Sequence, residues 1–169
     1  MKRIIILLLA LLPFVAKAQS YIDMDQATEN ARTVVTKPAT IISGDDVYLM
    51  RFVYSKLGTS EMYYTTLVFV EQDKAWVIAP KSIGTFHMAS GKKVELRTLI
   101  DSESQRQSNG KYTITSSYII PNADVNEMLD AFSHISVRTS AGSITIPIDF
   151  DTASFLMMSY LELLSKTGR

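Results

Sequence analysis

The sequence predicts an α+β fold that is predominantly antiparallel β, a curled sheet or a two-layer sandwich, with one short internal helix and a C-terminal helix. Runs rich in β-branched and aromatic residues recur between residues 33 and 148, which is typical of strands. Glycine-containing turns separate several of these runs and indicate hairpins. A wide apolar stripe at helical spacing follows only after residue 150.

The N-terminus has the layout of a secretory signal peptide. Two cations precede an unbroken apolar run at residues 4–12, which is shorter than the roughly 20 residues that cross a bilayer. Small residues stand three and one positions before a cut after Ala18. We therefore expect residues 1–18 to be a signal peptide and residues 19–169 to form a single β-rich domain with a C-terminal helix.

Charge and cysteine content restrict the possible partners. Loss of residues 1–18 removes three cations and no anion, leaving 14 Lys and Arg against 17 Asp and Glu, a net charge of −3. Such a domain has no general field that attracts nucleic acid. The chain has no cysteine, and an exported chain without disulfides fits a bacterial envelope. We expect a periplasmic, cell-surface or extracellular protein, with no transmembrane segment in its mature form and no nucleic-acid partner.

The first third of the domain predicts one edge strand and then a meander. Residues 21–32 are polar and suggest a short helix or a loose segment. Residues 33–42 read as an edge strand, because an internal proline removes a ladder donor. The next three runs are close in sequence and predict an antiparallel meander. These runs are residues 47–55, 62–70 and 75–79.

Three turns with glycine predict the later strands. Ser90-Gly91 separates residues 85–89 from 92–100, and Asn109-Gly110 precedes a strand at 111–120. Both residues of an Asn-Gly pair tolerate positive φ, so this is the strongest hairpin signal. A last hairpin has its turn at Ala141-Gly142, between residues 135–139 and 143–148. In total we expect seven to nine strands.

Two helices are expected. Residues 124–132 place apolar side chains at i, i+3, i+4 and i+7, and Asp124 with Glu127 has the spacing of a capping box. The final helix is predicted over residues 152–165, with Asp151 as its N-cap and Gly168 closing its C-terminus. Its wide apolar face predicts that this helix lies across the sheet.

The spacing of chemically active residues predicts no catalytic residue, no metal site and no cofactor. His87 and His134 are 47 positions apart, so they lack the one-turn spacing of a helical zinc site and read as two separate side chains at element ends. No Gly-x-Ser-x-Gly elbow is present. Ser90-Gly91-Lys92 resembles the end of a phosphate loop, but the preceding glycine is missing and a strand follows.

Aromatic residues are the remaining candidates for binding. Most of them lie in the first half of the chain, where cross-strand core pairs are their usual role. An exposed ring would stack on a sugar or anchor a protein. Tyr63 and Trp76 each neighbour a polar turn, so we select them as candidate binding residues.

The absence of catalytic patterns favours an exported, non-catalytic binding or interaction module of the bacterial cell envelope, whose partner is a protein or a glycan. A first alternative is a polymer hydrolase with two carboxyls in one cleft. A second is a structural subunit that assembles through an exposed edge strand, either 33–42 or 143–148. The carboxyls considered for the hydrolase are Glu71, Asp73, Glu95, Asp101 and Glu103.

Overall fold

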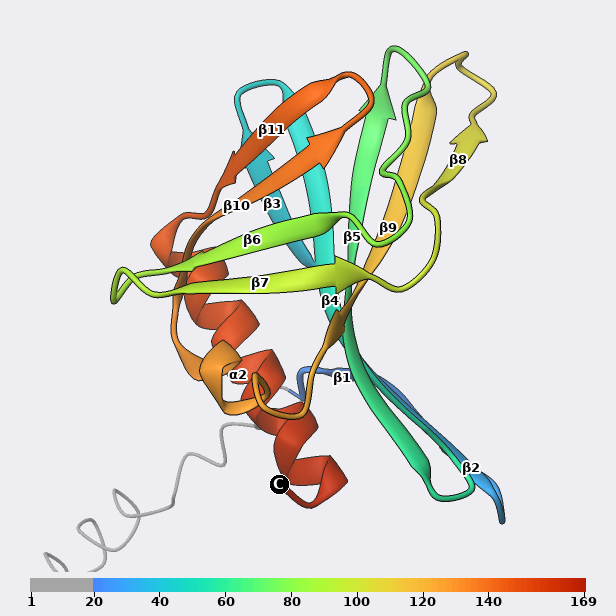
Figure 1. The fold of residues 1–169 in the computed structure, drawn as a ribbon, viewed down its shortest axis with the longest axis vertical. Coiled ribbons are helices and arrows are strands. Elements are labelled where there is room, and N and C mark those ends of the chain that lie inside the picture. The colour runs from blue at the N-terminus through green and yellow to red at the C-terminus, as the bar shows by residue number, and fades with distance from the viewer. Residues whose placement is uncertain (1–19) are drawn as a thin grey trace, which may run out of the picture.

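The computed structural model describes residues 20–169, so the predicted signal peptide lies outside the described part of the chain. Within it, eleven strands form one antiparallel sheet that curls strongly, and a single α-helix packs against it (Figure 1). The predicted fold class is confirmed. The elements are β1 (Ile22–Ala27), β2 (Ala31–Thr36), β3 (Ala39–Ser43), β4 (Asp46–Leu57), β5 (Ser60–Gln72), β6 (Ile83–Met88), β7 (Lys93–Thr98), β8 (Glu103–Arg106), β9 (Tyr112–Ile120), η1 (Asn126–Leu129), β10 (Phe132–Thr139), β11 (Gly142–Pro147) and α2 (Phe150–Thr167).

The strand order is β1-β2-β4-β5-β9-β7-β6-β10-β11, and every pairing is antiparallel. β3 pairs with the first half of β4 and β8 pairs with the first half of β9, so both lie off the main path. β3 also contacts β11, which brings the two ends of the curled sheet together. In Figure 1, β6 and β7 run across the view in front of β4.

The core fills the inside of the curl. β7 and β9 alternate strictly between buried and more exposed positions, because successive side chains of a strand point to opposite faces. Aromatic rings link the sheet to the helix: Phe52 of β4 lies 4.7 Å from Tyr160 of α2 and 6.2 Å from Phe132 of β10, between ring centroids. Tyr160 also donates a hydrogen bond to the carbonyl of Val125 at 3.0 Å.

α2 has well-defined caps at both ends. The side chain of Asp149 accepts a 2.8 Å hydrogen bond from the backbone N–H of Thr152, so Asp149 is the N-cap instead of the predicted Asp151. Gly168 ends the helix at φ 85°, as predicted, and its N–H donates to the carbonyl of Leu164. Glu162 accepts hydrogen bonds from the N–H of Tyr21 at 2.6 Å and the hydroxyl of Ser20 at 2.9 Å. Thus α2 also holds the start of the described chain.

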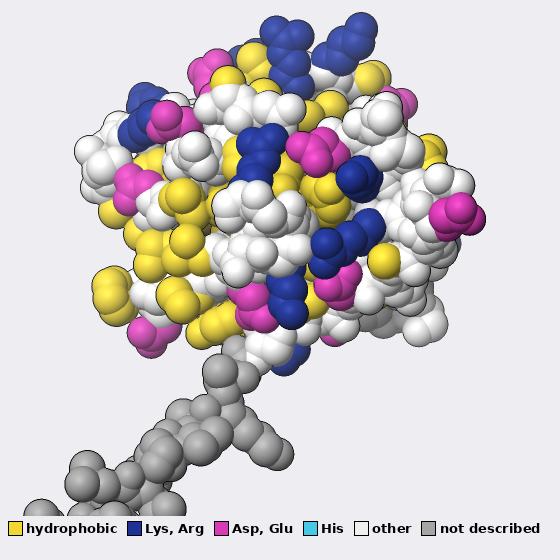
Figure 2. All heavy atoms as spheres, turned by 90° about the horizontal axis from the view of Figure 1, so that it is seen from below, with side chains coloured by type: hydrophobic (Ala, Val, Ile, Leu, Met, Phe, Trp, Pro, Cys, Tyr) yellow, Lys and Arg dark blue, Asp and Glu magenta, His cyan; other side chains and the backbone are white. Residues whose placement is uncertain are grey.

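The outer side of α2 remains partly apolar. Phe150, Met158 and Leu161 are 84%, 43% and 41% exposed. Figure 2 shows the molecule from below, with many hydrophobic side chains on the side where α2 lies and charges of both signs spread over the whole view. Among residues 20–169, no helix is long and apolar enough to cross a membrane.

The predicted helix at residues 124–132 is wrong. Only a 3-10 turn, η1, forms there, and no side chain caps it. Phe132 belongs instead to β10, where it pairs with Met88 of β6. An isolated helix this short has little stability. Phe132, the last apolar residue of the predicted stripe, is part of β10 instead. Glu127 forms a salt bridge with Lys92 rather than closing a capping box.

Several strand boundaries also differ from the prediction. Residues 75–79 form no strand, and β5 pairs with β9 rather than with a third strand of a meander. β1 replaces the expected helix or loose segment, and β8 lies in a stretch read as polar loop. Both are mostly exposed, so neither has the apolar alternation by which strands are recognised. Together with the division of the predicted strand 33–42 into β2 and β3, these changes give eleven strands among the described residues, in place of seven to nine.

Candidate functional site

Four neighbouring strands, β7, β6, β10 and β11, carry a continuous polar surface on their outer side, here called the four-strand face. Their cross-strand register aligns the outward side chains in three rows. The residues between the rows point inward and are largely buried. The rows are Arg97, Ile83, Arg138 and Ser143; Glu95, Thr85, Ser136 and Thr145; and Lys93, His87, His134 and Pro147.

The two histidines meet on this face. His87 of β6 is the direct cross-strand neighbour of His134 of β10, and their rings stack with centroids 3.8 Å apart and planes 17° apart. The register shifts at Ser133, just before His134, and such a bulge re-aims the following side chain. Both side chains are partly exposed and lie near strand ends, as the sequence indicated, and strand pairing brings them together although their spacing did not favour a pair.

Ser133 fixes the arrangement of the pair. Its hydroxyl donates to the carbonyl of His87 at 3.1 Å and lies 3.1 Å from Nδ1 of His134. The single hydroxyl proton of Ser133 is donated to the carbonyl of His87. In its contact with neutral His134, the Ser133 oxygen is therefore the acceptor and Nδ1 is the donor, so Nε2 keeps its lone pair. Desolvation, followed by the charges of His134 and Lys93, lowers the pKa of His87. The lowered pKa favours the neutral form of His87.

A shallow depression of about 490 Å³ lies at one end of the four-strand face. Its rim includes Lys81 and Arg138, while Thr85 and Glu95 line it. Lys81 has φ 59°, a left-handed conformation that is uncommon outside glycine and costs free energy. The turn holds Lys81 in this conformation through the hydrogen bond from the N–H of Ser82 to the carbonyl of Ala79 at 3.1 Å.

The four-strand face is positively charged, although the domain as a whole is slightly acidic. Lys81, Lys93, Arg97 and Arg138 lie on it or at its rim, against the single carboxylate of Glu95. Within the described residues, none of these four cations forms a salt bridge, whereas Arg32, Lys92, Lys111 and Arg169 do. Unpaired cations around a depression on a rigid sheet favour an anionic ligand.

The arrangement does not favour catalysis. Parallel stacked imidazoles direct their ring nitrogens side by side instead of toward one point, so they do not converge on a metal. Across residues 20–169, no group of three or more His, Asp or Glu gathers as metal ligands. Ser133 uses its proton on a backbone carbonyl and is not activated as a nucleophile. The face therefore offers charge and hydrogen bonds to a ligand.

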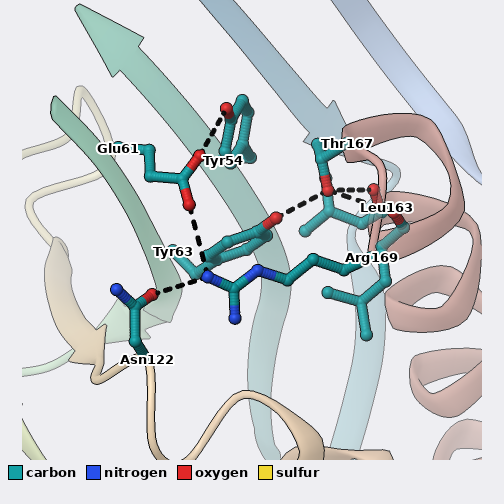
Figure 3. Close-up of polar contacts among 8 residues, drawn as sticks. Tyr54, Glu61, Tyr63, Asn122, Leu163, Thr167 and Arg169 are labelled. Carbon is teal, nitrogen blue, oxygen red and sulfur yellow. Dashed lines mark hydrogen bonds and ion pairs between the residues drawn. The ribbon is translucent and has the colours of Figure 1, made fainter. Parts of the chain in front are cut away.

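Tyr63, one of the two candidate binding residues, is only 1% exposed. The guanidinium carbon of Arg169 lies over the ring of Tyr63, 5.4 Å from the ring centroid (Figure 3). The hydroxyl of Tyr63 lies 2.7 Å from the hydroxyl of Thr167. Arg169 also contacts Glu61 at 3.3 Å and Asn122 at 3.1 Å. Tyr63 thus has the core role that is usual for aromatic residues of strands, because the end of α2 covers its ring despite the neighbouring polar turn.

Trp76, the other candidate, is 8% exposed. Its ring packs edge-on against Phe69 at 4.6 Å, and the following backbone is fastened by serine hydroxyls. The N–H groups of Val77 and Ile78 donate to Ser140 at 3.1 Å and Ser102 at 2.8 Å. This loop folds inward over the open end of the curl, so its polar neighbours do not expose the indole.

The residues proposed for the hydrolase do not form a catalytic pair in a cleft. Glu71 and Asp73 both lie 3.9 Å from Lys111, but their side chains are 61% and 88% exposed. Four depressions are well defined on the surface of the described residues. Only the one on the four-strand face includes any of the five candidate carboxyls, namely Glu95.

The two predicted edge strands, 33–42 and 143–148, differ from the prediction in the neighbours that they have in the structure. The segment 33–42 divides at Pro38 into β2, which is paired on both sides, and β3, which is paired only with β4. β11 is the last strand of the sheet, as predicted, but it contacts β3. The two proposed edges thus lie near each other in the structure.

Comparisons with known proteins place no constraint on this site. No family model matches the chain and no curated protein is similar to it. Among solved structures, the chain is similar to a chain of the human pre-T cell receptor, with 12% sequence identity and a TM-score of 0.25, over 70% of this chain and 95% of that chain. A similarity this low supports no argument about function.

Proposed function

We propose that the protein is an exported, non-catalytic binding module of the bacterial envelope and that it binds its partner through the four-strand face. The observation that carries this proposal is a set of four cations without salt bridges on one sheet face, two of which, Lys81 and Arg138, line a depression that contains the single carboxylate of Glu95. A sheet face held by three strand pairings is rigid, so little ordering free energy is lost on binding.

Export is the second part of the proposal, and it is supported by the signal-peptide layout of residues 1–18. Mass spectrometry of the protein recovered from its producing cells tests this part. We expect a chain that begins at Gln19, and a product that retains Met1 overturns the proposed location.

Sedimentation with isolated envelopes tests the binding surface. Wild-type protein is expected to pellet with the envelopes, and the double variant Arg97→Gln/Arg138→Gln to remain in solution. Lys56→Gln/Lys74→Gln is the matched control, because both lysines are exposed and lie outside the four-strand face. Equal sedimentation of the two double variants contradicts the assigned surface, and degradation of envelope polymer by the wild type contradicts the non-catalytic role.

A further inference from the structure

We infer that the ligand of the four-strand face is an acidic polysaccharide, held by the carboxylate or sulfate groups along its chain. This inference rests on the proposed function, because it names the ligand of the same surface. It follows from three properties of the face: the side-chain types it presents, the spacing of its cations and the groups that it lacks.

The face presents cations, hydroxyl groups and the His87–His134 pair, but no Phe, Tyr or Trp ring. Neutral sugars are usually held by stacking on aromatic side chains, and protein interfaces depend on buried aromatic or large apolar anchors. The only large apolar side chain in the three rows is Ile83, which is 44% exposed. The cations and hydroxyl groups of the face are suited to a ligand that is recognised by charge and by hydrogen bonds. The hydroxyls between the cations belong to Thr85, Ser136, Ser143 and Thr145.

The cations are spread over the face instead of converging on one point. Arg97 on β7 and Arg138 on β10 are separated by β6, which places their backbones about 10 Å apart. Lys93 and Arg97 are four residues apart on β7, or about 13 Å. A single small anion contacts only one of these groups. A polymer with an acid group on every sugar, or on every second sugar, contacts several at once.

The two arginines suit carboxylate and sulfate groups in particular. A guanidinium offers a planar fork of N–H donors that binds two oxygens of the same acid group. Single-stranded nucleic acid also carries regular anions, but proteins hold it by stacking the bases on large aromatic side chains, and the three rows of this face contain no Phe, Tyr or Trp. The predicted charge of −3 for the mature domain also disfavours a nucleic-acid partner.

Binding to defined polymers tests the inference. Polygalacturonate supplies carboxylates, dextran sulfate supplies sulfates, unmodified dextran is the neutral control, and polyglutamate is an acidic peptide. We expect the full mature chain to bind at least one acidic polysaccharide and not dextran. In Arg97→Gln/Arg138→Gln the affinity should fall about tenfold or more, because each charged hydrogen bond is worth about 1.5–3 kcal/mol. Lys56→Gln/Lys74→Gln, which changes the charge by the same amount, should bind as the wild type does.

Three outcomes overturn the inference. Equal losses in the two double variants would show a non-specific response to net charge. Binding to polyglutamate with the same affinity and the same dependence on Arg97 and Arg138 would make the ligand an acidic peptide. Failure of every acidic polysaccharide to bind, while Arg97→Gln/Arg138→Gln still abolishes sedimentation with envelopes, would leave the proposed surface intact and refute the ligand class alone.

Discussion

His87 and His134 stack at 3.8 Å across two strands that are 44 residues apart at their nearest ends, and the bulge at Ser133 holds them in place. Lys93 of β7 adjoins His87, and Pro147 of β11 adjoins His134. A positive charge on either ring therefore lies beside another imidazole and, for His87, beside an ammonium group. The fold favours the neutral form of His87, and this has a consequence for stability.

We predict that stability falls between pH 7.5 and pH 5.5. The pKa of His87 is lowered from 6.5 in the folded protein, so the unfolded chain binds more protons at this residue in that range. The free energy of unfolding therefore decreases as the pH drops. Thermal unfolding at a series of pH values measures the effect. Carboxylates with lowered pKa, such as Asp25 and Asp130, lose their stabilising contribution only at lower pH.

Two variants show whether the histidine pair causes this dependence. In His87→Gln the difference in Tm between pH 7.5 and pH 5.5 should become smaller. In His134→Gln, the electrostatic effect of His134 on His87 is removed, so the dependence should also weaken, although desolvation and Lys93 remain. An unchanged difference in both variants would assign the effect to other groups.

Arg169 should stabilise the end of α2. Its guanidinium joins Glu61, Asn122 and the ring of Tyr63, which links the helix to β5 and to the loop after β9. Replacing Arg169 with alanine should lower the free energy of unfolding by about 1 kcal/mol, since partly exposed ion pairs and cation–π contacts are each worth up to that amount. Chemical denaturation measures the change.

Lys166→Ala is the control for Arg169, because Lys166 lies in the last turn and has no salt bridge among the described residues. This variant should change stability by less than about 0.5 kcal/mol. Equal losses in the two variants would mean that general charge at the helix end, and not the contacts of Arg169, is responsible.

Tyr118 carries a buried hydroxyl without a hydrogen-bond partner, and so does Ser116 two residues before it. Burial raises the pKa of Tyr118 to about 12. Removing a buried hydroxyl that has no partner breaks no hydrogen bond. It also avoids the desolvation cost of that group, which is about 1–3 kcal/mol. We therefore expect Tyr118→Phe to be as stable as the wild type or more stable in chemical denaturation. A loss above about 1 kcal/mol would reveal a partner, such as a buried water molecule.

Gly84 is required by the same ring. A Cβ at this position would lie 2.7 Å from Cε1 of Tyr118, although the backbone there is ordinary for a strand. Gly84→Ala should therefore cost about 1–3 kcal/mol through overpacking. In the background of Tyr118→Val, which removes the ring, the same change should cost clearly less in a double-mutant cycle. Additive losses would place the strain elsewhere.

Local patterns predicted the elements that depend on local chemistry. The turn glycines marked three hairpins, and the apolar stripe with Gly168 marked α2. Local patterns failed where the outcome depends on distant partners, as at η1, whose expected apolar stripe loses Phe132 to β10. The burial of Tyr63 and Trp76 has the same origin, because each is covered by a segment distant in sequence or folded back over the core.

The four-strand face was not predictable in the same way. β6 and β10 are neighbours only because the sheet curls, and the row of Arg97, Ile83 and Arg138 exists only in that strand order. The alternation of 92–100 did place Lys93, Glu95 and Arg97 on one side of a strand, as observed. That pattern predicted the side chains that β7 contributes to the four-strand face. Its neighbours come from long-range pairing, which sequence periodicity does not specify.

Lys81 offers a way to separate binding from stability. Its φ of 59° is unfavourable for lysine and acceptable for glycine. Lys81→Gly should therefore leave the free energy of unfolding unchanged or raise it by up to about 1 kcal/mol, while it removes one of the four cations of the face and weakens binding to the acidic polymer. Lys74→Gly, in the exposed turn before Trp76, is the control and should not weaken binding. A backbone strained in order to place a lysine at the rim is expected where the side chain serves a ligand. Lower stability of Lys81→Gly together with unchanged binding would show instead that Lys81 supports the fold.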